Sequence, residues 1–202
     1  MGLNSTSNSV TYLSVQNGKV AKRVQEPTAA SKSRTVEATG KVIYEELFDS
    51  ITGHMTAIST RDGNYGKELQ ITLADDRPYI LQLKLSSGPA SSFLRALPNV
   101  DLQKAVTLIP KIEVKGDVKR TSVIIAQGDK GVKWAFTKDA PGDLPPMKQI
   151  KVKGKDVWDD SDQLAYFEKM ISDINTKLTA SVAISHNAPT LGSDAGTDDL
   201  PF

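Results

Sequence analysis

Apolar and polar residues alternate in three consecutive segments, and this alternation constrains the fold more than any other feature of the chain. The segments are residues 51–57, 69–73 and 79–85. Because successive side chains of a strand point to opposite faces, each segment predicts a strand with one apolar face. Turn residues at 61–67 and 75–78 separate them, which predicts a three-stranded meander with a possible bulge at Gly53.

The segments on either side of the meander extend this pattern. Residues 36–44 suggest a strand interrupted at Gly40, and residues 91–97, between Gly88-Pro89 and Pro98, predict a short helix. Strands are then expected at residues 106–115, with Leu108, Ile112 and Val114 facing inward, at residues 121–127, and at residues 132–136.

The predicted order of three strands, a short helix and further strands is that of the OB-fold, a small five-stranded barrel. In this fold the face of strands 2 and 3 and the loops 1-2 and 4-5 bind nucleic acid. We therefore expect a mainly β protein, α+β by content, with an OB-fold barrel at its centre.

Further elements flank the expected barrel. Short β-prone runs at residues 10–15 and 19–24 bracket Gln16-Asn17-Gly18, a strong hairpin signal, and residues 25–33 read as a linker. Residues 148–155 alternate lysines with Ile150 and Val152, as an edge strand does. Residues 159–178 predict a helix with a stripe of apolar residues, formed by Leu164, Phe167, Ile171, Ile174 and Leu178.

The charge of the chain is unevenly distributed. The formal net charge is +1, but no Lys or Arg follows Leu178, while three aspartates do. Residues 1–178 therefore carry all 25 basic residues against 21 of the 24 acidic ones, a net charge of +4. We divide the chain into an N-terminal arm and hairpin (1–35), an OB-fold domain with a C-terminal helix (36–180) and a flexible acidic tail (181–202).

The sequence ends in Asp198, Asp199, Leu200, Pro201 and Phe202. An acidic tail with this ending resembles that of bacterial and phage single-stranded DNA-binding proteins. The resemblance implies that these five residues dock replication and recombination proteins and that the body binds single-stranded DNA, with self-association along the strand as an open possibility.

Binding single strands without sequence preference requires aromatic faces for bases and cations for phosphates. Tyr65, in the turn at 61–67, is the first stacking candidate. Trp134 shares the parity of Val132 and Phe136, so it can stack or pack in the core, and His54 is likewise open between stacking and a structural role. The candidate phosphate contacts, chosen from outward strand positions and loops, are Arg61, Lys67, Arg77, Lys84, Lys111, Lys115, Lys119 and Arg120.

Other classes of function find little support in the sequence. There is no cysteine, which removes disulfides, thiolate catalysis and cysteine-based zinc sites. His54 and His186 are far apart, and the aspartates at 159, 160 and 162 are explained by a helix N-terminus. No apolar run approaches the ~20 residues that span a bilayer. We expect a cytoplasmic, non-enzymatic protein without cofactor, metal or membrane partner.

The functional expectation is therefore sequence-nonspecific binding and protection of single-stranded DNA in phage DNA replication or recombination. Two alternatives remain open at this point. One is a mediator of strand annealing or recombination; the other is a β-barrel adaptor that recruits proteins through its tail and binds no DNA.

Overall fold

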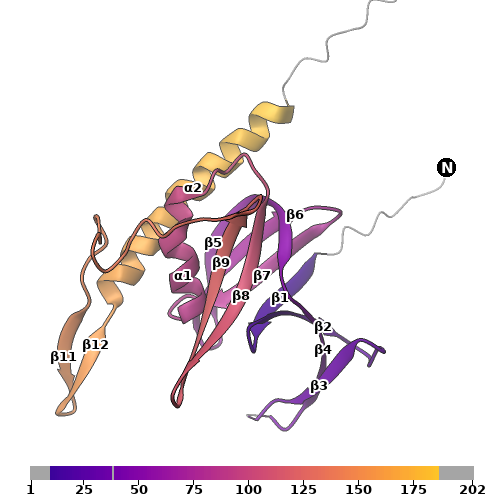
Figure 1. Ribbon diagram of the computed structural model, residues 1–202, viewed down its shortest axis with the longest axis horizontal. Helices are drawn as coiled ribbons and strands as arrows, with labels where there is room; N and C mark the ends of the chain where they lie inside the picture. The colour runs from indigo at the N-terminus through magenta and orange to yellow at the C-terminus, as the bar shows by residue number, and fades with distance from the viewer. Residues whose placement is uncertain (1–9, 38, 187–202) are drawn as a thin grey trace, which may run out of the picture.

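The computed structural model describes residues 10–37 and 39–186, so the predicted docking tail Asp198 to Phe202 lies outside the described residues. The protein is mainly β, with a long C-terminal helix (Figure 1). The elements in chain order are β1 (Thr11–Gln16), β2 (Lys19–Val24), β3 (Ser31–Thr35), β4 (Val42–Phe48), β5 (Ile51–Gly63), β6 (Gly66–Ala74), β7 (Pro78–Lys84), α1 (Gly88–Ala96), η1 (Leu97–Asn99), β8 (Val106–Lys115), β9 (Val118–Gln127), β10 (Lys130–Gly131), β11 (Lys148–Val152), β12 (Lys155–Asp159) and α2 (Ser161–His186).

Ten of these strands form one sheet in the order β10-β9-β8-β5-β6-β7-β1-β2-β4-β3. All pairs are antiparallel except β1 and β7, which run parallel with Thr11 opposite Tyr79 and Leu13 opposite Leu81. Among the described strands β3 and β10 are the two ends of this order, so the sheet is open and no closed barrel is formed.

The predicted meander is confirmed as β5, β6 and β7. Leu69, Ile71 and Leu73 on β6 are completely buried, as their alternation indicates. The bulge lies in β5 between Met55 and Ala57. It is not at Gly53, which pairs regularly with Val106 and whose added Cβ would come within 2.9 Å of the Ala74 carbonyl oxygen.

The predicted N-terminal hairpin is present and belongs to the main sheet. Asn17 and Gly18 at its turn have φ angles of 48° and 71°, the left-handed geometry that suits a two-residue hairpin loop. Its strands pair with β7 and β4, and Leu13 and Val20 are buried in the core. The turn also reaches β8, since a Cβ on Gly18 would lie 3.1 Å from the Ile112 backbone nitrogen.

Residues 25–44 differ from the expectation. Part of the predicted linker forms β3, and the single strand predicted at 36–44 is instead the turn between β3 and β4 followed by the first residues of β4. The Val36 carbonyl accepts hydrogen bonds from the backbone of Thr39 and Gly40, at 3.1 and 2.7 Å, which closes this turn. The alternation at 36–44 is thus divided between this turn and the beginning of β4.

The short helix is confirmed as α1. Ser87 is its N-cap, and its side-chain oxygen accepts a hydrogen bond of 3.4 Å from the Ala90 amide. Pro89 occupies the first turn, where its missing N–H group costs no helical hydrogen bond. Phe93 and Leu94 are completely buried against the sheet.

Two predictions for the C-terminal half of the sheet were wrong. Ile112 and Val114 have the inward parity of β8 but are exposed, because the β8–β9 hairpin projects beyond the core (Figure 1). Residues 132–136 form no strand, and only β10 pairs with β9 there. Phe136 nevertheless packs in the core, with its ring centroid 5.7 Å from that of Tyr166.

The C-terminal helix is confirmed and is longer than predicted. Phe167, Ile171 and Leu178 of its apolar stripe are buried. At its N-terminus the Asp159 carboxylate accepts a 3.0 Å hydrogen bond from the Ser161 amide, which lowers the pKa of Asp159. The aspartates at 159–162 therefore begin the helix, as expected.

One side-chain hydrogen bond joins α2 to the bulged strand β5. The Asn175 side-chain oxygen accepts from the Ile58 backbone N–H at 3.0 Å, next to the bulge. Because a bulge interrupts the regular strand ladder, this contact satisfies a backbone donor from the helix side.

Asn175→Ala is therefore expected to lower the free energy of unfolding by about 1–3 kcal/mol, the cost of leaving the Ile58 N–H without an acceptor. Urea denaturation followed by circular dichroism measures the change. Thr176→Ala, at the neighbouring exposed position on α2, is the matched control and should change stability by less than about 0.5 kcal/mol. Equal effects of the two substitutions would contradict the role given to Asn175.

Gly18 provides a second test of the packing. Gly18→Ala places a Cβ at a residue with positive φ, and this Cβ would lie within 3.2 Å of Ile112. Gly116 also has a positive φ, of 58°, but a Cβ added there, as in Gly116→Ala, would have no atom within 4 Å. Both should cost about 1–2 kcal/mol for the left-handed backbone. Gly18→Ala should lose more in urea denaturation, and equal losses would show that the turn does not pack on β8.

Candidate nucleic-acid interface

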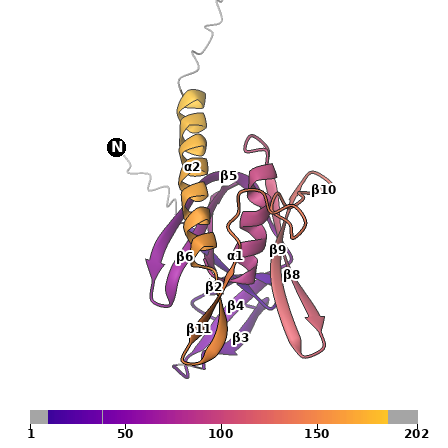
Figure 2. The same ribbon diagram turned by 90° about the vertical axis from the view of Figure 1, so that its left-hand side faces the viewer.

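A surface groove runs between α1 and β9, and we call it the α1–β9 groove. It is lined by residues of α1 and β9 and by the segment 132–137 that follows β10. Figure 2 shows α1 and β9 side by side at this place. Four cationic residues line it, which are Arg95, Lys119, Arg120 and Lys133.

The close packing of α1 on β9 forms the floor of the groove. A Cβ at Gly88 would lie 2.6 Å from the Thr121 carbonyl oxygen, so the helix begins in direct contact with the strand. The Ser92 hydroxyl, which is buried, accepts a 2.8 Å hydrogen bond from the Val123 amide. The helix thus satisfies a strand-edge donor that no neighbouring strand covers.

Trp134 forms one wall of the groove, and Arg95 holds it there. The Arg95 guanidinium carbon is 6.0 Å from the Trp134 ring centroid, within the range of a cation–π contact. The Arg95 carbonyl accepts from the Ala135 amide at 2.7 Å, and its guanidinium donates to the Phe136 carbonyl at 3.4 Å. Trp134 is 48% exposed while Phe136 is buried. The sequence allowed either ring to pack in the core, and in the structure it is Phe136 that does so.

The four cations of the groove outnumber its carboxylates: Glu113 of β8 is the one acidic residue among the described lining residues, and it lies opposite Arg120 in the β8–β9 pairing. None of the four forms an ion pair within the described part of the chain. Lys111 and Lys115 extend the basic surface along β8, where Lys115 pairs with Glu113 at 3.4 Å. Asp117 is the other acidic residue of the β8–β9 hairpin. The groove and hairpin therefore have a local excess of positive charge, which attracts polyanions.

The β5–β6 tip, where Tyr65 lies, has a different electrostatic character. Tyr65 is 80% exposed. Arg61 pairs with Glu68 at 3.1 Å, and Lys67 pairs with Glu168 of α2 at 2.6 Å. The Glu168 carboxylate raises the pKa of Lys67 through this hydrogen bond, and the proximity of Asp62 raises it further. Acidic neighbours thus balance the cations at this tip.

The structure separates the predicted site residues into distinct surfaces. Lys119, Arg120 and Trp134 meet in the α1–β9 groove, with Lys111 and Lys115 on the adjoining hairpin. The β5–β6 tip carries Arg61, Tyr65 and Lys67, and Lys84 lies opposite Glu68 in the sheet beside it. Figure 2 shows the β5–β6 and β8–β9 hairpins on opposite sides of α1.

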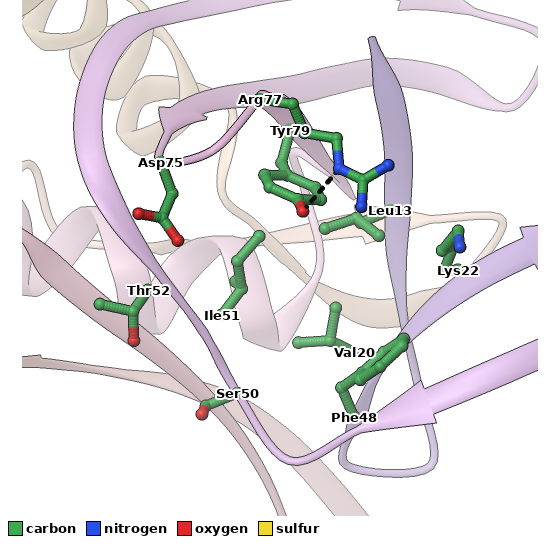
Figure 3. Close-up of a pocket in the computed structure, with 10 residues that line it drawn as sticks. All are labelled: Leu13, Val20, Lys22, Phe48, Ser50, Ile51, Thr52, Asp75, Arg77 and Tyr79. Carbon is green, nitrogen blue, oxygen red and sulfur yellow. Dashed lines mark hydrogen bonds between the residues drawn. The ribbon is translucent and has the colours of Figure 1, made fainter. Parts of the chain in front are cut away.

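Arg77 belongs to a third place, a pocket of about 320 Å³ between the N-terminal hairpin and the β6–β7 turn (Figure 3). Leu13, Val20 and Phe48 contribute apolar walls, and the cations at its mouth already have partners. Arg77 pairs with Asp76 at 3.4 Å and donates a 2.9 Å hydrogen bond to the Tyr79 hydroxyl.

Lys22, the other cation of this pocket, donates to Glu46 at 3.2 Å. The pocket therefore offers a phosphate little free positive charge. His54 is exposed on β5 opposite Ala74, near the β6–β7 turn.

Sequence reasoning missed Arg95 and Lys133. Arg95 is the basic residue of the predicted helix, and Lys133 precedes Trp134. Both were visible as cations, but nothing in the local pattern indicated that α1 packs on β9 and brings them to Lys119 and Arg120.

The described residues contain no group of three or more His, Asp or Glu side chains placed to hold a metal ion. Neither of the helices α1 and α2, as far as the structure describes them, has the length and apolarity needed to cross a bilayer.

Comparison of the chain with protein-family models, with curated proteins and with solved structures finds no match.

Proposed function

We propose that this protein binds single-stranded DNA without sequence preference and protects it during DNA replication or recombination, as a phage-type single-stranded DNA-binding protein. The α1–β9 groove and the β8–β9 hairpin are the proposed interface. The observation that carries the proposal is a set of four cations that form no ion pair among the described residues, beside the exposed ring of Trp134: Arg95, Lys119, Arg120 and Lys133. Binding of single strands without sequence preference requires cations that contact the phosphate backbone of the DNA and an aromatic face on which its bases stack.

The order of the elements supports the proposal. Strands β5, β6 and β7, followed by α1, β8 and β9, have the strand and helix order of an OB-fold. We propose that the sheet is an open variant of this fold. The β8–β9 hairpin then corresponds to the loop between strands 4 and 5 and the β5–β6 tip to the loop between strands 1 and 2, both of which contact nucleic acid in OB-folds.

The acidic tail completes the proposed function. Residues 198–202 are proposed to recruit replication or recombination proteins, because an acidic and apolar peptide suits a pocket with an apolar slot and a basic rim. The tail is acidic and the proposed groove is cationic. A DNA strand is therefore expected to bind the groove and not the tail, and partner docking is proposed for the tail alone.

The salt dependence of oligo-dT binding tests the phosphate contacts. The double variant Lys119→Gln/Arg120→Gln should reduce the slope of log K against log salt concentration by about 1.4, that is, about 0.7 for each lost contact to a single strand. The control Arg61→Gln/Lys67→Gln removes two cations that acidic neighbours already balance, so its slope should change less. Salt-insensitive or absent binding of the unsubstituted protein would contradict the proposal and favour a protein adaptor.

Substitution of the aromatic candidates tests which side of α1 binds bases. Trp134→Ala should weaken oligo-dT binding by about 1–3 kcal/mol if its ring stacks on a base. Tyr65→Ala should do the same if the strand also reaches the β5–β6 tip. Fluorescence anisotropy of a labelled oligonucleotide measures both, and an effect of Tyr65→Ala alone would move the interface away from the groove.

A further inference from the structure

The β11–β12 hairpin stands apart from the main sheet. Its two strands form a separate sheet in which every residue of β11 is exposed. Figures 1 and 2 show it projecting from the N-terminal end of α2, toward the same side of the molecule as the β8–β9 hairpin. An isolated two-stranded hairpin is marginally stable in water, so packing within the described chain does not explain this extended arm.

The base of the hairpin is attached to α2. Lys148 at the start of β11 pairs with Asp162 at 2.5 Å, and this contact raises the pKa of Lys148. At the end of β12, Asp159 accepts the hydrogen bond from the Ser161 amide that begins the helix. These two contacts use Lys148 and the two aspartates Asp159 and Asp162, and they attach the base of the hairpin to the beginning of α2.

The segment before the hairpin attaches it to the α1–β9 groove. This segment follows the groove wall at 132–137 and includes Leu144, whose side chain is buried. The Pro145 carbonyl accepts a 2.7 Å hydrogen bond from the Gln163 side chain of α2. This hydrogen bond attaches the segment to α2 just before the hairpin begins.

The distal part of the hairpin, residues 150–157, is cationic. It carries Lys151, Lys153 and Lys155 against Asp156, and none of these lysines forms an ion pair within the described residues. Lys153 and Gly154 at the tip have φ angles of 50° and 79°, which makes a tight two-residue turn. Lys153 is thus presented at the far end of the arm.

Trp158 adds an aromatic face to this arm. It is 62% exposed and lies opposite Gln149, on the same face of the hairpin as Lys151 and its cross-strand neighbour Asp156. The chain has two tryptophans, and both are on the surface beside lysines. Large aromatic side chains contribute most to stability when buried, so two exposed tryptophans next to cations that form no ion pair among the described residues indicate surfaces that bind a ligand.

We propose that the β11–β12 hairpin is a second contact site for the same DNA strand, with Trp158 stacking on a base and Lys151 and Lys153 contacting phosphates. This inference rests on the proposed function, and it extends the interface beyond the α1–β9 groove. A strand bound in the groove continues past Trp134 to the hairpin, so that a long oligonucleotide engages both sites and a short one fills only the groove.

Single-tryptophan variants test this proposal directly, because base stacking quenches the emission of the stacked indole. Trp134→Phe leaves Trp158 as the reporter, and Trp158→Phe leaves Trp134. We expect an oligo-dT of about 30 nucleotides to quench both reporters, and one of about 6 nucleotides, which lies within the range of one OB-fold site, to quench Trp134 much more strongly than Trp158.

A charge variant provides a second measurement. Lys151→Gln/Lys153→Gln should lower the salt slope for the long oligonucleotide by about 1.4 and leave that for the short one unchanged. Lys32→Gln, an exposed lysine on β3 at the far end of the sheet order, is the matched control and should alter neither. Unchanged near-ultraviolet circular dichroism verifies that each variant is folded.

The outcomes separate this inference from the proposed function. If the long oligonucleotide binds and quenches Trp134, but Trp158 emission and the salt slope of Lys151→Gln/Lys153→Gln do not change, the hairpin proposal is wrong and the groove remains. If neither oligonucleotide binds, the proposed function itself is wrong. If the lysine substitutions instead alter the concentration dependence of sedimentation, the hairpin joins copies of the chain, which also overturns the proposal.

Discussion

The parallel pairing of β1 with β7 determines the shape of this molecule. A strand has two edges, and β7 uses one for β6 and the other for β1. Because β1 occupies that second edge, β9 cannot pair there, and the sheet continues through β2 and β4 to β3 instead of closing. The edge of β9 faces α1, where the Ser92 hydroxyl accepts from the Val123 amide. The α1–β9 groove, with its four cations, forms along this helix-covered edge.

The positive charge of the α1–β9 groove depends on where the carboxylates of the chain lie. A net charge of +1 for the whole chain suggests no polyanion partner, yet the acidic side chains pair with cations elsewhere. Glu68 and Glu168 pair with the arginine and the lysine of the β5–β6 tip, and Glu45 of β4 accepts two hydrogen bonds from Arg34 of β3. Cations on α1, on β9 and on the β11–β12 hairpin keep their charge available. The electrostatic field of the surface therefore differs from what composition alone suggests.

The core leaves the tryptophans free for another role. Leucine, isoleucine, valine and phenylalanine fill the space between the sheet and the two helices, and Asn175 joins α2 to the bulge of β5. Trp134 and Trp158 contribute little to this packing. They lie on two surfaces that the segment ending at Leu144 and Pro145 connects. If both surfaces bind DNA as proposed, the buried Leu144 and the hydrogen bond of Pro145 to α2 limit how far the two surfaces can separate.

The sequence by itself determined the local elements of this protein, and only the tertiary structure decided their pairing and the site. Alternation predicted the meander, breakers predicted α1, Asn17-Gly18 predicted the first hairpin, and the apolar stripe predicted α2, because each signal acts within one element. Ile112 and Val114 carry the same signal and are exposed, since parity shows which side chains share a face but not how far the core extends. Lys119, Arg120 and Trp134 were identified as candidates, but Arg95 and Lys133 join them only through the contact between α1 and β9. Strand edges are chosen by competition among distant segments, and no local pattern records the result.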